Sequence, residues 1–163
     1  MLRFIQTGAT TLHVTLADIE AARRVISGVV LRTPMLPAPK LSALTDAEIY
    51  VKYENLQVTN SFKDRGALVK LTSLTKTERE RGVVAMSAGN HAQAVAYHAA
   101  RLAIPATIVM PVTTPFVKVA STRSYGADVV LHGESVAAPP ACSIPTPCAQ
   151  SSMRSARGSN TNW

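Results

Sequence analysis

Residues capable of chemistry occur first around Lys63, in the stretch Ser61–Gly66 with the sequence Ser-Phe-Lys-Asp-Arg-Gly. This stretch follows a strand-like run and opens a segment with apolar residues at helical spacing. A lysine at such a junction lies beside backbone N–H groups that have no partner within the helix. Desolvated behind Phe62, its neutral amine could form a Schiff base with a carbonyl. A solvated surface lysine is the more common alternative for this stretch alone.

A second stretch, Ser87–Gln93, has the sequence Ser-Ala-Gly-Asn-His-Ala-Gln between an apolar run and an alanine-rich segment. Gly89 permits a close approach of the backbone, and the helix expected after it directs its dipole at an anion. Considered alone, the stretch is equally typical of an ordinary loop with a hydrogen-bonded His91. The remaining histidines have no evident partner and are expected at the surface; they are His13, His98 and His132.

The two stretches together resemble the pyridoxal-phosphate enzymes of the tryptophan-synthase-β-like fold (fold type II), and among these the serine/threonine dehydratases, or threonine ammonia-lyases. The resemblance runs from about Thr15 to about Val136. It implies pyridoxal 5'-phosphate as cofactor and L-threonine or L-serine as substrate. The implied reaction eliminates water and yields 2-oxobutyrate or pyruvate plus ammonia.

The resemblance also implies a role for each residue of the two stretches. Lys63 would be catalytic, holding the cofactor as a Schiff base and then taking the Cα proton of the substrate. Phe62 would lie against the cofactor ring, and Asn90 would donate a hydrogen bond to its phenolic oxygen. The residues that would bind the substrate carboxylate are Ser87, Ala88, Gly89, Asn90 and His91.

Ala88 favours elimination over racemisation within the resembled group. Racemases of this group carry a serine there, which supplies a second acid or base on the opposite face of the cofactor, whereas alanine has no proton to exchange. A serine racemase-like or other fold type II activity remains a less favoured alternative. The preference between threonine and serine stays open.

From Glu48 onward, short β-branched runs alternate with longer helical segments, which is typical of βαβ units. We therefore expect an α/β fold with a four-stranded, parallel, doubly wound (Rossmann-like) sheet. Lys63 and Asn90 should lie near one another at the carboxyl edge of this sheet. The expected strands are Ile49–Tyr53, Val83–Met86, Ala106–Met110 and Asp128–Leu131, and the expected helices are Ser61–Leu74, Asn90–Leu102 and Pro115–Tyr125.

Three regions are expected along the chain: an N-terminal segment (1–47), a small α/β domain (48–136) and a disordered tail (137–163). The N-terminal segment should contain a helix capped by Thr15 with Asp18, and the resemblance implies that it packs on a large domain that is mostly missing here. The proline-rich tail lacks any helical or strand period, and we expect a shifted reading frame near Val136. By the resemblance, the phosphate-binding loop comes later, so weak cofactor binding and slow turnover are expected. An inert α/β domain is the main alternative.

Composition excludes several other classes. The net charge of +7 is dispersed along the chain rather than clustered, so no nucleic-acid partner is expected. No apolar run approaches the roughly 20 residues of a membrane span. Cys142 and Cys148 lack further ligands at metal-binding spacing, so no metal is expected. A cytoplasmic enzyme is expected, and the resemblance implies homo-oligomers for full-length relatives.

Overall fold

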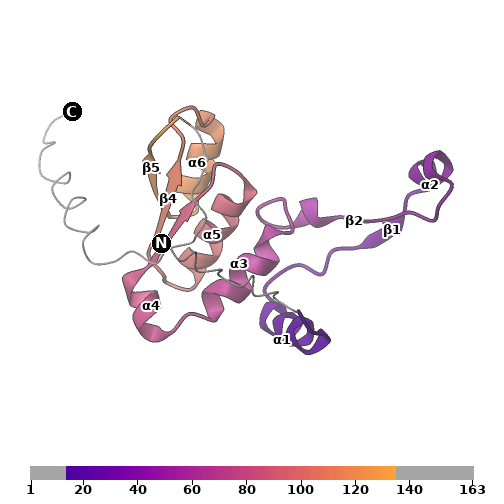
Figure 1. The fold of residues 1–163 in the computed structure, drawn as a ribbon, viewed down its shortest axis with the longest axis horizontal. Coiled ribbons are helices and arrows are strands. Elements are labelled where there is room, and N and C mark those ends of the chain that lie inside the picture. The colour runs from indigo at the N-terminus through magenta and orange to yellow at the C-terminus, as the bar shows by residue number, and fades with distance from the viewer. Residues whose placement is uncertain (1–13, 135–163) are drawn as a thin grey trace, which may run out of the picture.

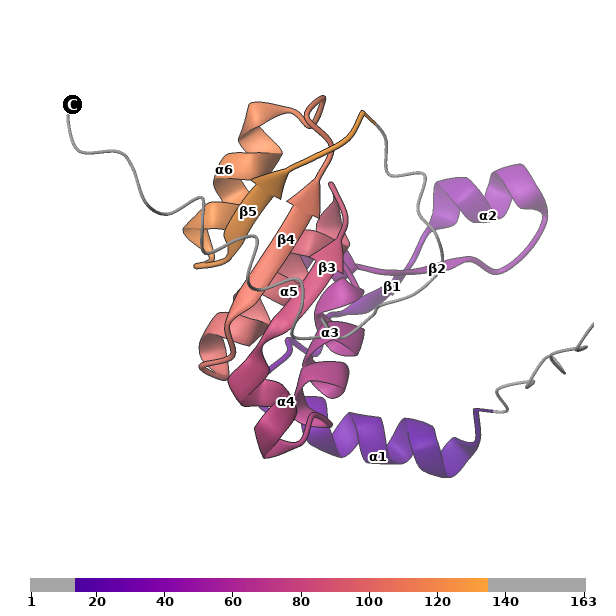
Figure 2. The ribbon, with the colours of Figure 1, turned by 60° about the vertical axis from the view of Figure 1, so that its left-hand side comes forward.

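The computed structural model describes residues 14–134 of the chain. Their central element is a parallel sheet of β3 (Val83–Met86), β4 (Ala106–Met110) and β5 (Asp128–Leu131), in that order. Three helices alternate with or precede these strands: α3 (Lys63–Thr72), α5 (Asn90–Arg101) and α6 (Phe116–Ser124). Figure 2 shows these helices together behind the sheet. The bounds of β3, β4 and β5 are those expected from the sequence, so these three strand predictions are confirmed.

The core lies between α5 and the central strand β4. Ile108 and Met110 of this strand are buried, while the alternating Thr107 and Val109 are less so, as a strand with one helix-covered face requires. Small side chains on α5 let the helix approach the sheet closely. The buried alanines of this helix are Ala92, Ala94, Ala96 and Ala99.

The prediction of a fourth strand in the parallel sheet is wrong. β2 (Tyr50–Lys52) pairs antiparallel with β1 (Met35–Pro37), and the described sheets have three and two strands. Only Val51 of β2 is even partly buried, whereas every residue of β4, the central strand of the parallel sheet, is at least partly buried. The partner strand β1 lies close in the sequence, and the entropy cost of closing the connection between the two strands, residues 38–49, is modest. The doubly wound arrangement is also not found, because α3, α5 and α6 share one face of the described sheet (Figure 2).

Helix α1 (Leu16–Ile26) begins as expected. The backbone N–H of Thr15 donates to Asp18 Oδ2 at 2.9 Å, and the N–H of Asp18 donates to Thr15 Oγ1 at 3.3 Å. Helix α2 (Pro39–Thr45) joins β1 to β2, and the three elements form an arm (residues 35–52) that projects from the rest of the protein (Figure 1). A 3₁₀ turn (Glu54–Leu56) connects the arm to the Lys63 segment.

Helix α4 (Lys76–Arg81) was not expected from the sequence. Within residues 14–134 no helix is long and apolar enough to cross a membrane. The predicted boundary at residue 48 stays a prediction. The predicted tail, residues 137–163, lies outside the described residues, as does His13.

Candidate active site

Lys63 begins helix α3, and a tight loop delivers the chain to it. Asn60 in this loop has a left-handed backbone, with φ of 56°, and Ser61 Oγ accepts a hydrogen bond from the Lys63 N–H at 3.2 Å. The Lys63 ammonium lies 4.7 Å from the centroid of the Phe62 ring. Phe62 is 60% exposed, and Lys63 is exposed as well. The described residues therefore do not bury Lys63, contrary to the expected desolvation behind Phe62.

The second loop, Ser87–Gly89, leads from β3 into helix α5. Its backbone is fixed by the Ser87 N–H, which donates to the Val109 carbonyl of β4 at 3.1 Å, and by the Gly89 N–H, which donates to Ser87 Oγ at 3.3 Å. Gly89 is the N-cap of α5 and makes no side-chain cap bond. A Cβ built on Gly89 would meet nothing within 4 Å, so the loop backbone faces open space. Ala88 is partly buried, and Asn90 is exposed.

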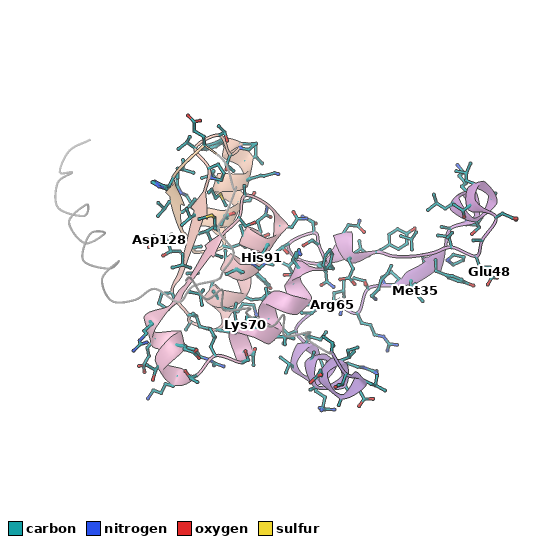
Figure 3. All side chains as sticks on the ribbon, in the orientation of Figure 1. Met35, Glu48, Arg65, Lys70, His91 and Asp128 are labelled. Atoms are coloured by element: carbon teal, nitrogen blue, oxygen red, sulfur yellow. The ribbon has the colours of Figure 1, made fainter. Side chains whose placement is uncertain are left out.

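The two motif helices pack against each other, and their charges interact. α3 and α5 are in extensive contact, and Figure 3 shows Arg65 and His91 on these neighbouring helices. Partial burial and, second, the positive charge of Lys63 hold the pKa of His91 below its ordinary value of 6.5. The structure thus brings Lys63 within electrostatic reach of the residue next to Asn90. A shared site of Lys63 and Asn90 stays a prediction.

A buried pair that sequence reasoning missed joins the same two helices. Asp64 Oδ1 lies 2.9 Å from His98 Nε2, and both side chains are almost completely buried. The expected surface position of His98 is therefore wrong, because it shares the buried face of α5 with Val95 and Ala99. Burial raises the pKa of the Asp64 carboxyl, but hydrogen bonds from His98 and Thr59 outweigh it and leave this pKa below its ordinary value.

A second missed cluster ties the Lys63 helix to the segment before it. Arg65 donates to both carboxylate oxygens of Glu54, from Nε at 3.0 Å and from Nη2 at 2.8 Å. Thr33 and Gln57 also donate to this carboxylate. Mainly through the Arg65 hydrogen bonds, the pKa of Glu54 falls to about 2. The arginine of the Ser-Phe-Lys-Asp-Arg-Gly stretch thus holds the chain in place.

Comparison with known proteins gives this geometry its context. The family described as pyridoxal-phosphate dependent enzyme matches residues 26–150, beyond the expected end of the resemblance near Val136. The chain belongs to this family. An L-threonine ammonia-lyase of Thermotoga maritima is 53% identical over 120 residues, which are 74% of this chain and 30% of that protein.

Two solved structures resemble the described fold. The processed threonine deaminase isoform 2 of Solanum lycopersicum has a TM-score of 0.65 at 41% identity, over 74% of this chain and 33% of that one. The serine racemase of Dictyostelium discoideum has a TM-score of 0.69 at 39% identity, over 74% of this chain and 40% of that one. The chain therefore spans about a third of the length of the curated ammonia-lyase that it matches.

The described residues have groups that could bind the aldehyde and the phenolic oxygen of pyridoxal phosphate. Lys63 supplies a primary amine that solvent and aldehyde can reach, Asn90 supplies an amide, and the Gly89 backbone lies open at the start of α5. These are the groups that an aldehyde, a phenolic oxygen and an anion require. Among residues 14–134, no group of three or more histidine, cysteine or acidic side chains could hold a metal ion.

Proposed function

We propose that the chain supplies the lysine-bearing part of a pyridoxal-phosphate-dependent threonine/serine ammonia-lyase. The proposed reaction converts L-threonine or L-serine to 2-oxobutyrate or pyruvate plus ammonia. The observation that carries the proposal is the packing of α3 against α5, two helices that each begin within one of the two motifs. The identity of 53% to an L-threonine ammonia-lyase supports the choice of substrate class.

In this proposal each residue acts through a group already described. Lys63 anchors the cofactor and moves the substrate proton, while Phe62 lies beside the cofactor ring and Asn90 holds the phenolic oxygen. The cofactor, when bound, supplies an electron sink for negative charge at Cα. The loop backbone and His91 bind the substrate carboxylate. The residues of that loop are Ser87, Ala88 and Gly89.

Ala88 again favours elimination over racemisation, since its side chain has no proton to exchange. The likeness to a serine racemase keeps racemisation as a measurable side reaction. A cytoplasmic location and homo-oligomeric full-length relatives stay predictions. So does the expected lack of nucleic-acid, membrane and metal partners.

An inert α/β domain is the second candidate function, and one observation favours it. The described residues leave both Lys63 and Phe62 exposed, so they do not by themselves enclose a cofactor ring. In this case the two motifs would be present without a competent site, and Lys63 would react like any surface lysine.

Chemical trapping separates the two candidates. The purified chain is incubated with pyridoxal phosphate, reduced with borohydride, and mapped by mass spectrometry. We expect modification at Lys63 well above that at Lys70, an exposed lysine of the same helix, and loss of the Schiff-base absorption in Lys63→Ala but not in Lys70→Ala. Equal labelling of the two lysines would favour the inert domain. Incubation with threonine and detection of 2-oxobutyrate then tests the reaction itself.

A further inference from the structure

The buried Asp64–His98 pair has a place in the fold that neither the motifs nor the proposed chemistry explains. Asp64 is 2% exposed and His98 is 1% exposed, and they join α3 to α5 through the 2.9 Å contact of Oδ1 with Nε2. Taking a carboxylate out of water is unfavourable, and its partners repay this only when the geometry is good. The position of the pair therefore calls for a reason beyond packing.

The other carboxylate oxygen of Asp64 holds the loop that precedes Lys63. Oδ2 accepts hydrogen bonds from the Thr59 N–H at 3.2 Å and from the Thr59 hydroxyl at 2.8 Å. Asn60, which lies between Thr59 and Asp64 in the chain, has a left-handed backbone, a conformation that needs support from its surroundings. One carboxylate thus fixes the Lys63 loop on one side and the helix that opens at Asn90 on the other.

Stability alone is a poor explanation for this pair. The carboxylate only accepts hydrogen bonds, so Nε2 of His98 carries the hydrogen and donates. Nδ1 of His98 is buried and has no hydrogen-bond partner among the described residues. An apolar pair of similar volume would remove both the buried carboxylate and this unsatisfied nitrogen, and such replacements are often neutral or stabilising.

We propose that Asp64 and His98 are positioning residues, which set the Lys63 loop against the start of the Asn90 helix. This inference rests on the proposed function for its purpose, but the geometry that it asserts exists without cofactor. The pair acts on the lysine through the backbone, since Asp64 follows Lys63 directly and its carboxylate closes the loop before it.

The direct test measures the coupling between Lys63 and His91 without any cofactor. The pKa of His91 is measured by NMR titration with Lys63 present and with Lys63→Met, and the difference is the coupling. We expect the coupling to fall in His98→Leu and in the double variant Asp64→Leu/His98→Leu. It should persist in His98→Gln, whose amide NH₂ can still donate to Asp64. Glu80→Gln, which removes an exposed carboxylate 3.9 Å from Lys76, is the matched control and should leave it unchanged.

Trapping with pyridoxal phosphate and borohydride gives a second readout. The ratio of labelling at Lys63 to labelling at Lys70 should fall about tenfold in the two leucine variants and stay within about twofold in His98→Gln, because small displacements strongly affect oriented reactions. If Lys63 is never preferred in the unchanged protein, the proposed function fails, yet the NMR coupling still tests the positioning.

Chemical denaturation separates positioning from stability. The double leucine variant should unfold at a denaturant concentration similar to that of the unchanged protein while losing the coupling. Full coupling in a folded leucine variant would overturn the proposal. If the leucine variants do not fold, Thr59→Val takes their place, because it keeps the shape of the side chain and removes the hydroxyl that donates to Asp64 at 2.8 Å, and undiminished coupling there has the same meaning.

Discussion

The part of the protein before the Lys63 loop and the part after it bury different kinds of side chain. Among the described residues, the buried apolar side chains begin at Ala67 and continue through α5, β4 and α6. In residues 14–60 the buried side chains are polar: Thr33, Gln57 and Thr59. Helix α1, the arm and the 3₁₀ turn contain no buried residue at all.

The two parts are held in the folded structure by different interactions. The later part forms around a continuous apolar core, which is the main favourable contribution in folding. The earlier part is attached through polar bonds, chiefly the Glu54–Arg65 pair and the hydrogen bond that Arg65 Nη2 donates to the Leu31 carbonyl at 3.2 Å. Its own apolar side chains stay at the surface, including Leu16, Leu44 and Tyr50. We expect this earlier part to unfold locally before the core does.

The largest test of this contrast uses two isoleucines. Ile108 of β4 is fully buried, at 0% exposure, whereas Ile19 of α1 is 57% exposed. Ile108→Ala should lower the free energy of unfolding by about 2–5 kcal/mol, because it removes buried methyl groups and leaves a cavity. Ile19→Ala should change it by less than about 0.5 kcal/mol. Urea denaturation followed by circular dichroism measures both.

An equal loss in the two variants would contradict the contrast, since it would show that Ile19 is buried in solution. A concentration-dependent midpoint for the unchanged protein, abolished by Ile19→Ala, would identify self-association through α1 as the reason. Either result would mean that α1 does not belong to a part of the protein held only by polar bonds.

How well the sequence predicts each feature depends on how local its cause is. The capping box of Thr15 with Asp18 lies within one turn, and the start of α1 follows from it. Helix α4 has an equally local signal, since the Thr75 N–H donates to Glu78 Oε2 at 2.7 Å and the Glu78 N–H donates back to Thr75 Oγ1 at 3.3 Å. The Thr-x-x-Glu spacing could have revealed this helix.

Partners far apart in the sequence were not predictable. The run at Ile49–Tyr53 indicated a strand correctly, but nothing in it specifies whether β1 or β3 is its neighbour. The helical spacing of Val95, His98 and Ala99 could have predicted a buried histidine. Its partner Asp64 lies 34 positions away and is visible only in the fold.

The second prediction concerns the polar attachment at acid pH. The folded pKa of Glu54 is about 2, below its ordinary value of 4.5, so its ionised form stabilises the folded state. This contribution is complete above about pH 4.5 and is lost as the pH falls toward 2. Allowing for partial solvent screening, Glu54→Gln should lower the free energy of unfolding by about 1–2 kcal/mol at pH 7 and by much less at pH 2.

Hydrogen exchange locates the effect of Glu54→Gln. Amide protection should fall first around β1 and β2, whose attachment passes through Glu54, while β4 keeps its protection. Glu80→Gln, at an exposed carboxylate, is the control and should leave both the stability and the exchange pattern unchanged. A loss that is equal at both pH values would mean that the carboxylate charge is not the cause.

The smallest expected effect is the most informative about the junction between the two parts. Lys63 stands where the polar attachment ends and the core begins, and its charge helps to lower the pKa of His91. Lys63→Met should therefore raise the pKa of His91, though burial, the larger cause, should still hold it below 6.5. Lys70→Met, which removes an exposed charge from the same helix, should leave the pKa of His91 unchanged. The titration is followed by NMR at low ionic strength, and added salt should shrink the difference between Lys63→Met and the unchanged protein, because salt screens charges that reach solvent.

Equal responses to the two lysine variants would mean that His91 senses only the net charge of the molecule. The two motif loops would then have to be placed farther apart than the packing of α3 on α5 indicates.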